Sequence, residues 1–236
     1  MATTFRYLRA TTPMTHRPDV AFLLPNLQGG GAERVFLNLA SEFTRRGVDT
    51  ELVLACSEGV FMEQAAPAVK LVELERPNEL RALGPLARHL RRSRPRVVVS
   101  ALNTMNLVAV AAVLASRSQS ALWLTQHSDM TAHATNDESR RARLFPHLAR
   151  AVFPWANGWI CVSEAVADDL ARRCQIPRQQ IRVIYNPLDI ARIRRLGGAA
   201  SGHPWLAERR GPVLVAAGRL VPQKDFATAI RGLASL

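Results

Sequence analysis

Short apolar segments alternate with amphipathic segments along most of this 236-residue chain. The short segments predict strands at 20–24, 50–55, 69–74, 96–100, 121–125, 158–162 and 181–185. The amphipathic segments predict helices at 32–46, 79–92, 104–115, 139–153, 163–173 and 189–196. This alternation indicates an α/β fold, a Rossmann-like parallel sheet with helices on both faces. Ligands of such sheets bind at the carboxyl ends of the strands.

A glycine-rich run, QGGGAE at residues 28–33, lies between the first predicted strand and the first predicted helix. Three glycines let the backbone come close to a ligand, and a helix start offers free N–H groups and a positive dipole end. Such a turn suits an anionic or sugar-phosphate group. Tight packing of a strand on a helix can also require glycine, so the run alone leaves both explanations open.

The composition predicts a packed protein, because 48% of the residues are hydrophobic and no long low-complexity tract is present. The three cysteines, Cys56, Cys161 and Cys174, have unrelated spacings, which fits a reducing cytoplasm better than a disulfide framework or a zinc site. Residues 1–17 lack a secretory signal and are expected to form a disordered lead-in. The uncharged stretch 97–116 is interpreted as a buried strand and a buried helix rather than a membrane span.

A change in composition predicts the domain boundaries. Residues 18–196 form the first, Rossmann-like domain, and residues 197–212 (GGAASGHPWLAERRGP) are a linker in which glycine, proline and charge replace periodicity. A new buried strand is expected at Val213–Ala217, followed by a loop and by a helix from Asp225. Residues 213–236 therefore read as the first βα unit of a truncated second domain, too small for a core of its own.

Five segments together resemble the retaining glycosyltransferases of family four, of the glycosyltransferase group 1 type, which have the GT-B fold. They are the glycine run, the region of His127, and the segments ICVSE (160–164), VIYNP (183–187) and AGRLVPQKD (217–225). The resemblance covers most of the chain. It implies an enzyme that moves a hexose from a nucleotide-diphosphate sugar to a glycan or lipid-linked acceptor with retention. It also implies that residues 18–196 are the acceptor-side domain and 213–236 the start of the nucleotide-sugar-binding domain.

The resemblance assigns residues of the first domain to the acceptor and to the donor sugar. Gly29, Gly30, Gly31 and Glu33 would form the acceptor-side loop, and the other interpretation of Glu33 is an acid that complements the helix dipole. His127 would be the catalytic-site histidine, facing the cleft and hydrogen-bonding the donor sugar. A histidine at a strand end can also be purely structural.

The residue after this histidine is a departure from the family. Ser128 stands where the family often has aspartate, and Asp129 is displaced by one position.

The segment AGRLVPQKD would bind the donor diphosphate through Gly218, Arg219 and Lys224. Arginine offers a planar fork to phosphate and lysine a point charge, and fixed cations stabilise the negative charge that develops on a leaving diphosphate. Since two cations can replace a divalent metal, no metal and no cofactor are expected. The alternative for these residues is ordinary surface charge.

Two features of the family are missing from the sequence. The two glutamates, eight positions apart, that contact the donor and the pocket for the nucleobase are not found, so we expect little or no transfer activity from this chain alone. The alternatives are a non-catalytic half-fold module at a membrane surface, a sugar epimerase of the same fold, and a dinucleotide-binding oxidoreductase. The last requires G-x-G-x-x-G, and here Arg34 takes the place of the third glycine.

The net charge of +12 comes from 31 basic and 19 acidic residues. Basic clusters occur at Arg88–Arg96, Arg140–Arg143, Arg172–Arg173 and Arg192–Arg195. Part of this charge is a solvated surface, and the rest could contact anionic lipid. Nucleic acid is not expected as a partner, because no stacking platform is evident. We therefore expect a cytoplasmic protein that can lie peripherally on the inner face of the cell membrane.

Overall fold

The computed structural model describes residues 17–65, 67–130, 140–199, 202–208, 211–218, 220–221 and 224–234, with the backbone alone at 140–143. The chain divides into two compact units, one ending at Asn186 and one beginning at Pro187. The predicted domains and linker remain predictions, and the predicted lead-in lies outside the described residues except for Arg17.

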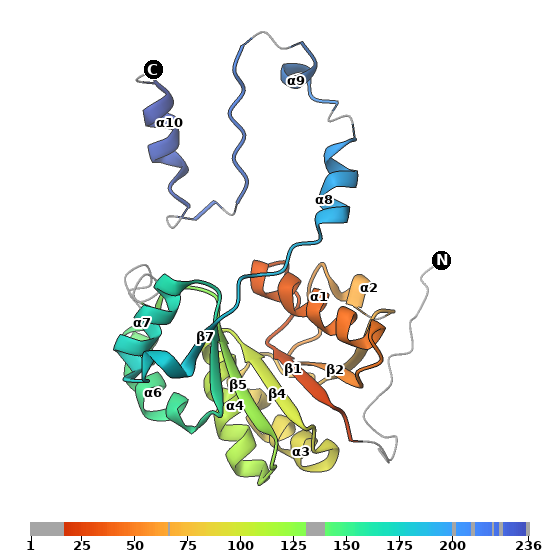
Figure 1. Cartoon of the computed structure of the whole chain (residues 1–236), viewed down its shortest axis with the longest axis vertical. Helices are drawn as coiled ribbons and strands as arrows, with labels where there is room; N and C mark the ends of the chain where they lie inside the picture. Colours follow the sequence, from red (N-terminus) through yellow and green to blue (C-terminus); the bar gives the residue numbers. More distant parts are fainter. Residues whose placement is uncertain are drawn as a thin grey trace. The chain divides into compact units, whose positions relative to one another are not determined.

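The first unit is built on a seven-stranded sheet with the order β3-β2-β1-β4-β5-β6-β7 (Figure 1). The strands are β1 (Val20–Leu24), β2 (Thr50–Leu54), β3 (Lys70–Glu73), β4 (Val97–Ala101), β5 (Ala121–Gln126), β6 (Gly158–Cys161) and β7 (Ile181–Val183). Every neighbouring pair is parallel. The predicted parallel sheet is therefore confirmed, with all seven strands in place.

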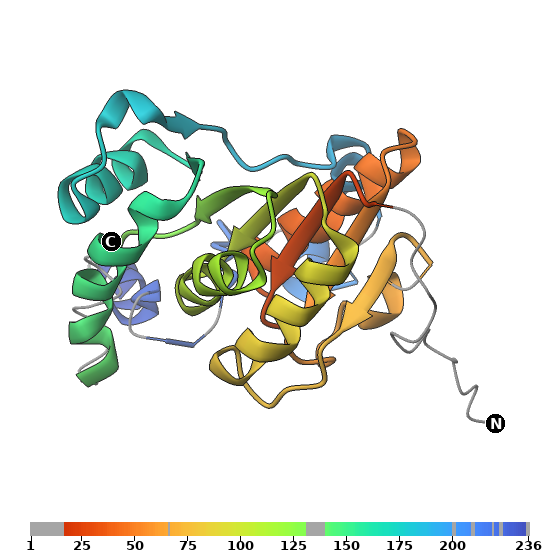
Figure 2. The same ribbon diagram turned by 90° about the horizontal axis from the view of Figure 1, so that it is seen from below.

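The helices of the first unit cover both faces of the sheet, as Figure 2 shows for α3 and α4 on one face. They are α1 (Gly31–Arg45), α2 (Met62–Ala65), α3 (Leu83–Ser93), α4 (Asn103–Ser116), α6 (Arg140–Val152) and α7 (Glu164–Cys174). Short 3-10 turns lie at η1 (Leu80–Ala82), η2 (Phe153–Trp155) and η3 (Arg178–Gln180). The predicted helices are present, and the four-residue helix α2 was not predicted.

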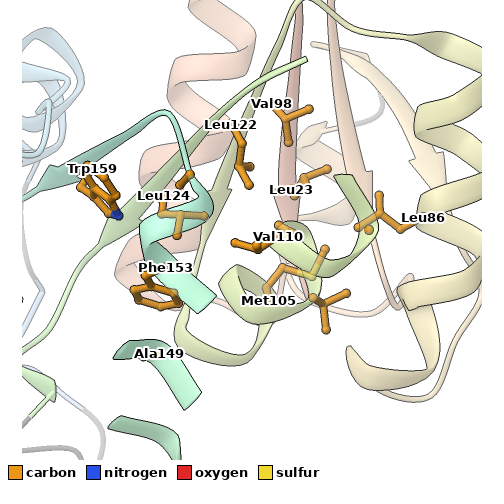
Figure 3. Close-up of a cluster of buried hydrophobic side chains, with 14 of the residues drawn as sticks. Leu23, Leu86, Val98, Met105, Val110, Leu122, Leu124, Ala149, Phe153 and Trp159 are labelled. Carbon is orange, nitrogen blue, oxygen red and sulfur yellow. The ribbon is translucent and has the colours of Figure 1, made fainter. Parts of the chain in front are cut away.

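Two hydrophobic clusters lie on opposite faces of the sheet. One joins the strands to α3, α4, α6 and α7, and includes Met105, Leu124 and Phe153 (Figure 3). The other joins them to α1 and α2, and includes Phe22 and Phe36. Successive residues of a strand point to opposite faces, which is why Leu23 belongs to the first cluster and Phe22 to the second.

The stretch 97–116 forms β4 and α4, as predicted. Within the described part of the chain, no helix is long and apolar enough to span a bilayer.

The second unit contains three helices among its described residues, α8 (Ile190–Gly197), α9 (Pro204–Glu208) and α10 (Phe226–Ala234). The prediction of a strand at Val213–Ala217 is wrong for this structure, in which residues 212–217 belong to no strand. A strand is defined by hydrogen bonds to a neighbour, and the described residues from Pro187 onward include no strand that could pair with it.

Candidate functional site

The carboxyl ends of β1, β4 and β5 lie next to one another, because these strands are neighbours and parallel. β1 is also the point where the strand order reverses, since β2 lies on one side of it and β4 on the other. In open α/β sheets such a switch point is where ligands bind. The glycine loop follows β1, and His127 follows β5.

The glycine loop is held against the segment that follows β2. The backbone N–H of Leu27 donates to the carbonyl of Glu58 over 2.9 Å, and that of Phe61 donates to the carbonyl of Leu27 over 3.2 Å. Gly29 has φ of +110°, a conformation that residues with a side chain rarely adopt, so the turn itself requires glycine at this position.

The backbone conformation does not require glycine at the next two positions. Gly30 has φ −76° and ψ 167°, which any residue can adopt. At Gly31, the first residue of α1, an added Cβ would meet nothing within 4 Å. Open space beside a helix N-terminus lets a ligand reach the free N–H groups there. The geometry therefore fits ligand approach, and the acceptor-side role of this loop remains a prediction.

Glu33 lies in the first turn of α1. Its carboxylate occupies the space that a side chain on Gly30 would fill. The acid is therefore next to the N-terminal end of the helix dipole, where negative charge is stabilising. This position suits both the dipole role and the acceptor-side role.

His127 is connected to the neighbouring strand through Thr125. The Thr125 hydroxyl donates to the backbone carbonyl of Ser100, with Oγ1 and O 2.9 Å apart. Its single proton is thereby used, so Oγ1 accepts from the Nε2–H of His127 over 3.1 Å. We infer from this chain of bonds that Nδ1 of His127 carries a lone pair. Nδ1 is buried without a hydrogen-bond partner among the described residues.

Burial keeps His127 neutral, lowering its pKa from 6.5 to about 4. Burial disfavours the charged imidazolium. The imidazole also packs edge-on against the ring of Phe36 in α1, with ring centroids 5.9 Å apart. The structure thus brings His127 together with the helix that follows the glycine loop.

The loop after β5 is fixed on both sides of His127. The side-chain amide of Gln126 donates to Asn103 Oδ1 and to the backbone carbonyl of Ser128, each over 2.9 Å. The backbone N–H of Met130 donates to the buried carboxylate of Asp169 in α7 over 2.9 Å. Ser128, which stands where the family often has aspartate, therefore lies in a turn that these hydrogen bonds hold in place.

Sequence reasoning missed the residues that hold His127. Thr125 ends the predicted strand 121–125 and Gln126 lies just beyond it, and neither residue gives a sign of its hydrogen-bond partners in the sequence. Leu102 was also missed. It has φ of +74° in the turn between β4 and α4, a strained conformation for leucine. Such strain tends to gather at functional sites, and this turn lies between the ends of β1 and β5.

The predicted diphosphate-binding residues belong to the second unit. The backbone N–H of Lys224 donates to the carbonyl of Val221 over 2.9 Å. A Cβ on Gly218 would lie 3.3 Å from Phe226 Cζ and 3.4 Å from Lys224 Cγ, so both side chains lie beside Gly218. Arg219 lies outside the described residues. The diphosphate-binding role of the three residues remains a prediction.

Among the residues that the structure describes, the cysteines and the acids form no recognisable metal centre. Cys56, Cys161 and Cys174 are free, and burial raises the pKa of the last two thiols to about 12. Across the described ranges, no three His, Cys, Asp or Glu side chains gather closely enough to hold a metal ion. The expectation that no metal is needed remains a prediction.

Solved structures share this fold. The structure of Anabaena HepE in complex with UDP-glucose is 18% identical, with a TM-score of 0.66 over 92% of this chain and 57% of that one. The lipopolysaccharide outer core galactosyltransferase WaaB, in its apo form, is 17% identical, with a TM-score of 0.55 over 72% of this chain and 46% of WaaB. Sucrose-phosphate synthase from Thermosynechococcus elongatus is 12% identical, with a TM-score of 0.52 over 80% of this chain and 54% of the synthase.

These likenesses establish the GT-B fold, and the chain spans about half the length of the structures it matches. No curated protein matches it. The family model of Glycosyltransferase Family 4 matches residues 29–192, which is more than half of the chain and includes the three glycines of the run and His127. The chain belongs to Glycosyltransferase Family 4.

Proposed function

We propose that this chain is part of a glycosyltransferase that moves a hexose from a nucleotide-diphosphate sugar to a glycan or lipid-linked acceptor with retention. The family match and the fold support the transferase class. HepE, a structure of the same fold, was solved with UDP-glucose. In the proposal, the glycine loop borders the acceptor, His127 contacts the reacting sugar, and Gly218, Arg219 and Lys224 bind the diphosphate.

The observation that carries the proposal is the buried Nδ1 of His127, which lies at the carboxyl edge of the sheet and has no hydrogen-bond partner among the described residues. A buried acceptor without a donor is unfavourable, by about 1–3 kcal/mol. A sugar hydroxyl is a suitable donor, because the Thr125 hydroxyl fixes the tautomer that leaves Nδ1 free to accept. The neutral imidazole thus positions the sugar by a hydrogen bond and is not an acid at neutral pH.

Bond cleavage leaves negative charge on the departing diphosphate. In the proposed mechanism Arg219 and Lys224 stabilise that charge as it develops, as preorganised cations do in other transfer reactions. Because both cations are supplied by the chain, we propose that neither a metal nor a cofactor takes part. We also propose that the chain alone transfers little sugar, since it spans about half the length of the structures it matches.

A calorimetric comparison of UDP and UDP-glucose tests the role of His127. We expect the sugar to add affinity over UDP alone, and His127→Ala to remove about three- to tenfold of it, the worth of one hydrogen bond. Binding of UDP itself should not change. The matched control is His147→Ala, which removes an exposed histidine from α6. Equal weakening of UDP and UDP-glucose by His127→Ala would contradict the proposed sugar contact.

A further inference from the structure

Three buried side chains near His127 each have one polar atom without a hydrogen-bond partner among the described residues. They are Ser100 in β4, Asn106 in α4 and Gln126 at the end of β5, and they are 0%, 1% and 3% exposed. The unpartnered atoms are Ser100 Oγ, Asn106 Oδ1 and Gln126 Oε1. A buried polar atom without a partner is unfavourable, so three of them in one region need an explanation.

The two strand residues lie on the face of the sheet that α4 covers. Successive residues of a strand alternate between the two faces, so Ser100 shares a face with Val98, and Gln126 shares one with Leu124. Val98 and Leu124 both belong to the cluster between the strands and α4. Ser100 and Leu124 are partners in the register of β4 and β5, which places Gln126 two residues further along the same face.

Hydrogen bonds bring α4 to the same place. The side-chain amide of Asn106 donates to the backbone carbonyl of Thr125 over 3.0 Å, next to Gln126 in β5. The side-chain amide of Gln126 donates to Oδ1 of Asn103, in the turn of α4 before Asn106, over 2.9 Å. The three unpartnered atoms therefore belong to neighbouring side chains, and no hydrogen bond joins any two of them.

The hydrogen-bonding needs of these atoms match one water molecule. The amide nitrogens of Asn106 and Gln126 already donate to oxygen atoms, so in each amide the oxygen is the atom that lacks a partner. Both amide oxygens need a donor, whereas the Ser100 hydroxyl can donate and its proton can rotate. A water can donate to both amide oxygens and accept from the hydroxyl, and internal waters commonly make about three hydrogen bonds.

We propose that Ser100, Asn106 and Gln126 bind a single internal water molecule between β4, β5 and α4. A bridging water joins polar atoms that are about 5 to 6 Å apart, too far for a direct hydrogen bond. Water fits better than a metal cation, because all three atoms are neutral and a buried cation without a counter-charge is costly. The site needs no sugar and no nucleotide, so it does not depend on the proposed function.

The water acts on the site through Gln126, which directly precedes His127. The Gln126 amide donates to the backbone carbonyl of Ser128 over 2.9 Å and so holds the loop on the far side of His127. The water gives Gln126 Oε1 its partner, which fixes the side chain that makes this bond. The water therefore positions the loop and takes no part in a reaction.

A high-resolution crystal structure of the full 236-residue chain tests the site directly. We expect one density peak at hydrogen-bond distance, about 2.7–3.2 Å, from Ser100 Oγ, Asn106 Oδ1 and Gln126 Oε1. Three results would overturn the proposal. There could be no peak, Ser100 could bond directly to either amide oxygen, or the peak could have six or more oxygen ligands at about 2.3–2.6 Å, which would mean a cation.

A double-mutant cycle tests whether the water joins the side chains in solution. In urea denaturation, Ser100→Ala should lower the folding equilibrium constant about tenfold in the unaltered chain, because one hydrogen bond is lost. In the Gln126→Met background the loss should be only about threefold, because the water has already lost a partner. Equal losses in the two backgrounds would contradict a shared water.

Ser116→Ala is the matched control, because it removes a buried hydroxyl of α4 that has its own partner, the backbone carbonyl of Val113 at 2.8 Å. Its effect should be the same in both backgrounds, and coupling as large as that of Ser100→Ala would overturn the proposal. Circular dichroism checks that each variant is folded. If Gln126→Met does not fold, Asn106→Leu takes its place in the cycle, with the same expected results.

Discussion

At the scale of single residues, the glycine loop contains two positions with opposite requirements. Gly29→Ala places a side chain at φ +110° and 3.0 Å from Val60, so we expect a loss of about 1–3 kcal/mol in the free energy of unfolding. Gly31→Ala places a side chain in the first turn of α1, where nothing lies within 4 Å of the added Cβ. The free energy of unfolding should therefore stay the same or rise by about 0.5–1 kcal/mol. Urea denaturation of both variants measures this difference. Equal destabilisation by the two would show that Gly31 is needed by the fold.

The lowered pKa of His127 predicts a pH dependence of stability. The unfolded residue titrates near 6.5 and the folded one near 4, so between these values only the unfolded state takes up the proton. The contribution of the neutral His127 to the free energy of unfolding is complete above pH 6.5. It decreases as the pH falls toward 4, by up to about 1.4 kcal/mol per pH unit. Urea denaturation across this range should show a shallower decrease for His127→Gln. Identical curves for the two proteins would contradict the burial of a neutral imidazole.

The sequence predicted the position of His127 but not its state. A motif places a histidine after a strand, whereas its tautomer depends on Thr125 and on the carbonyl of Ser100 in another strand. The distinction between Gly29 and Gly31 was also beyond the sequence, because it depends on where Val60 lies in space.

At the scale of elements, a buried charge network joins β2, β3 and α3. Glu51 in β2 is fully buried, with one carboxylate oxygen 2.7 Å from His89 Nε2 and the other 3.5 Å from Lys70 Nζ. Because a buried carboxylate without its partner is costly, His89→Ala should lower the free energy of unfolding by about 3 kcal/mol. Thermal or urea denaturation measures the loss, with the exposed His147→Ala as control. A loss no larger than that of the control would show that Glu51 does not depend on His89.

The strands and long helices were predictable because their apolar residues repeat with period 2 or 3.6. Three differences between the predicted and the observed elements have physical causes. Helix α2 has four residues, too few for a periodic pattern, and α9 is a five-residue helix within the stretch predicted as a linker. The segment at Val213–Ala217 is apolar enough for a strand but has no partner strand in the described part of its unit.

Glu51 is a related case, because a charged residue within a predicted strand would be assigned to the surface. Its burial depends on His89 and Lys70, which come from other elements.

At the scale of the whole molecule, the parallel sheet with helices on both faces could be predicted because strands and helices alternate. The strand order could not be predicted in detail, since nothing in a single strand states its neighbour. The site follows from that order: β1 lies beside β4, and β4 beside β5, which brings the glycine-loop helix to His127. The second part of the proposed site belongs to a separate unit, so its role depends on a measurement of binding.

In the proposed function, the chain binds a nucleotide diphosphate through the segment at 217–225. Calorimetric titration with UDP and with GDP, for the unaltered chain and for Arg219→Ala/Lys224→Ala, tests this binding. We expect saturable binding of at least one nucleotide, with loss of that binding in the double variant, because the two cations proposed to contact phosphate are removed. A folded chain that binds neither nucleotide, or a double variant that binds as well as the unaltered chain, would contradict it.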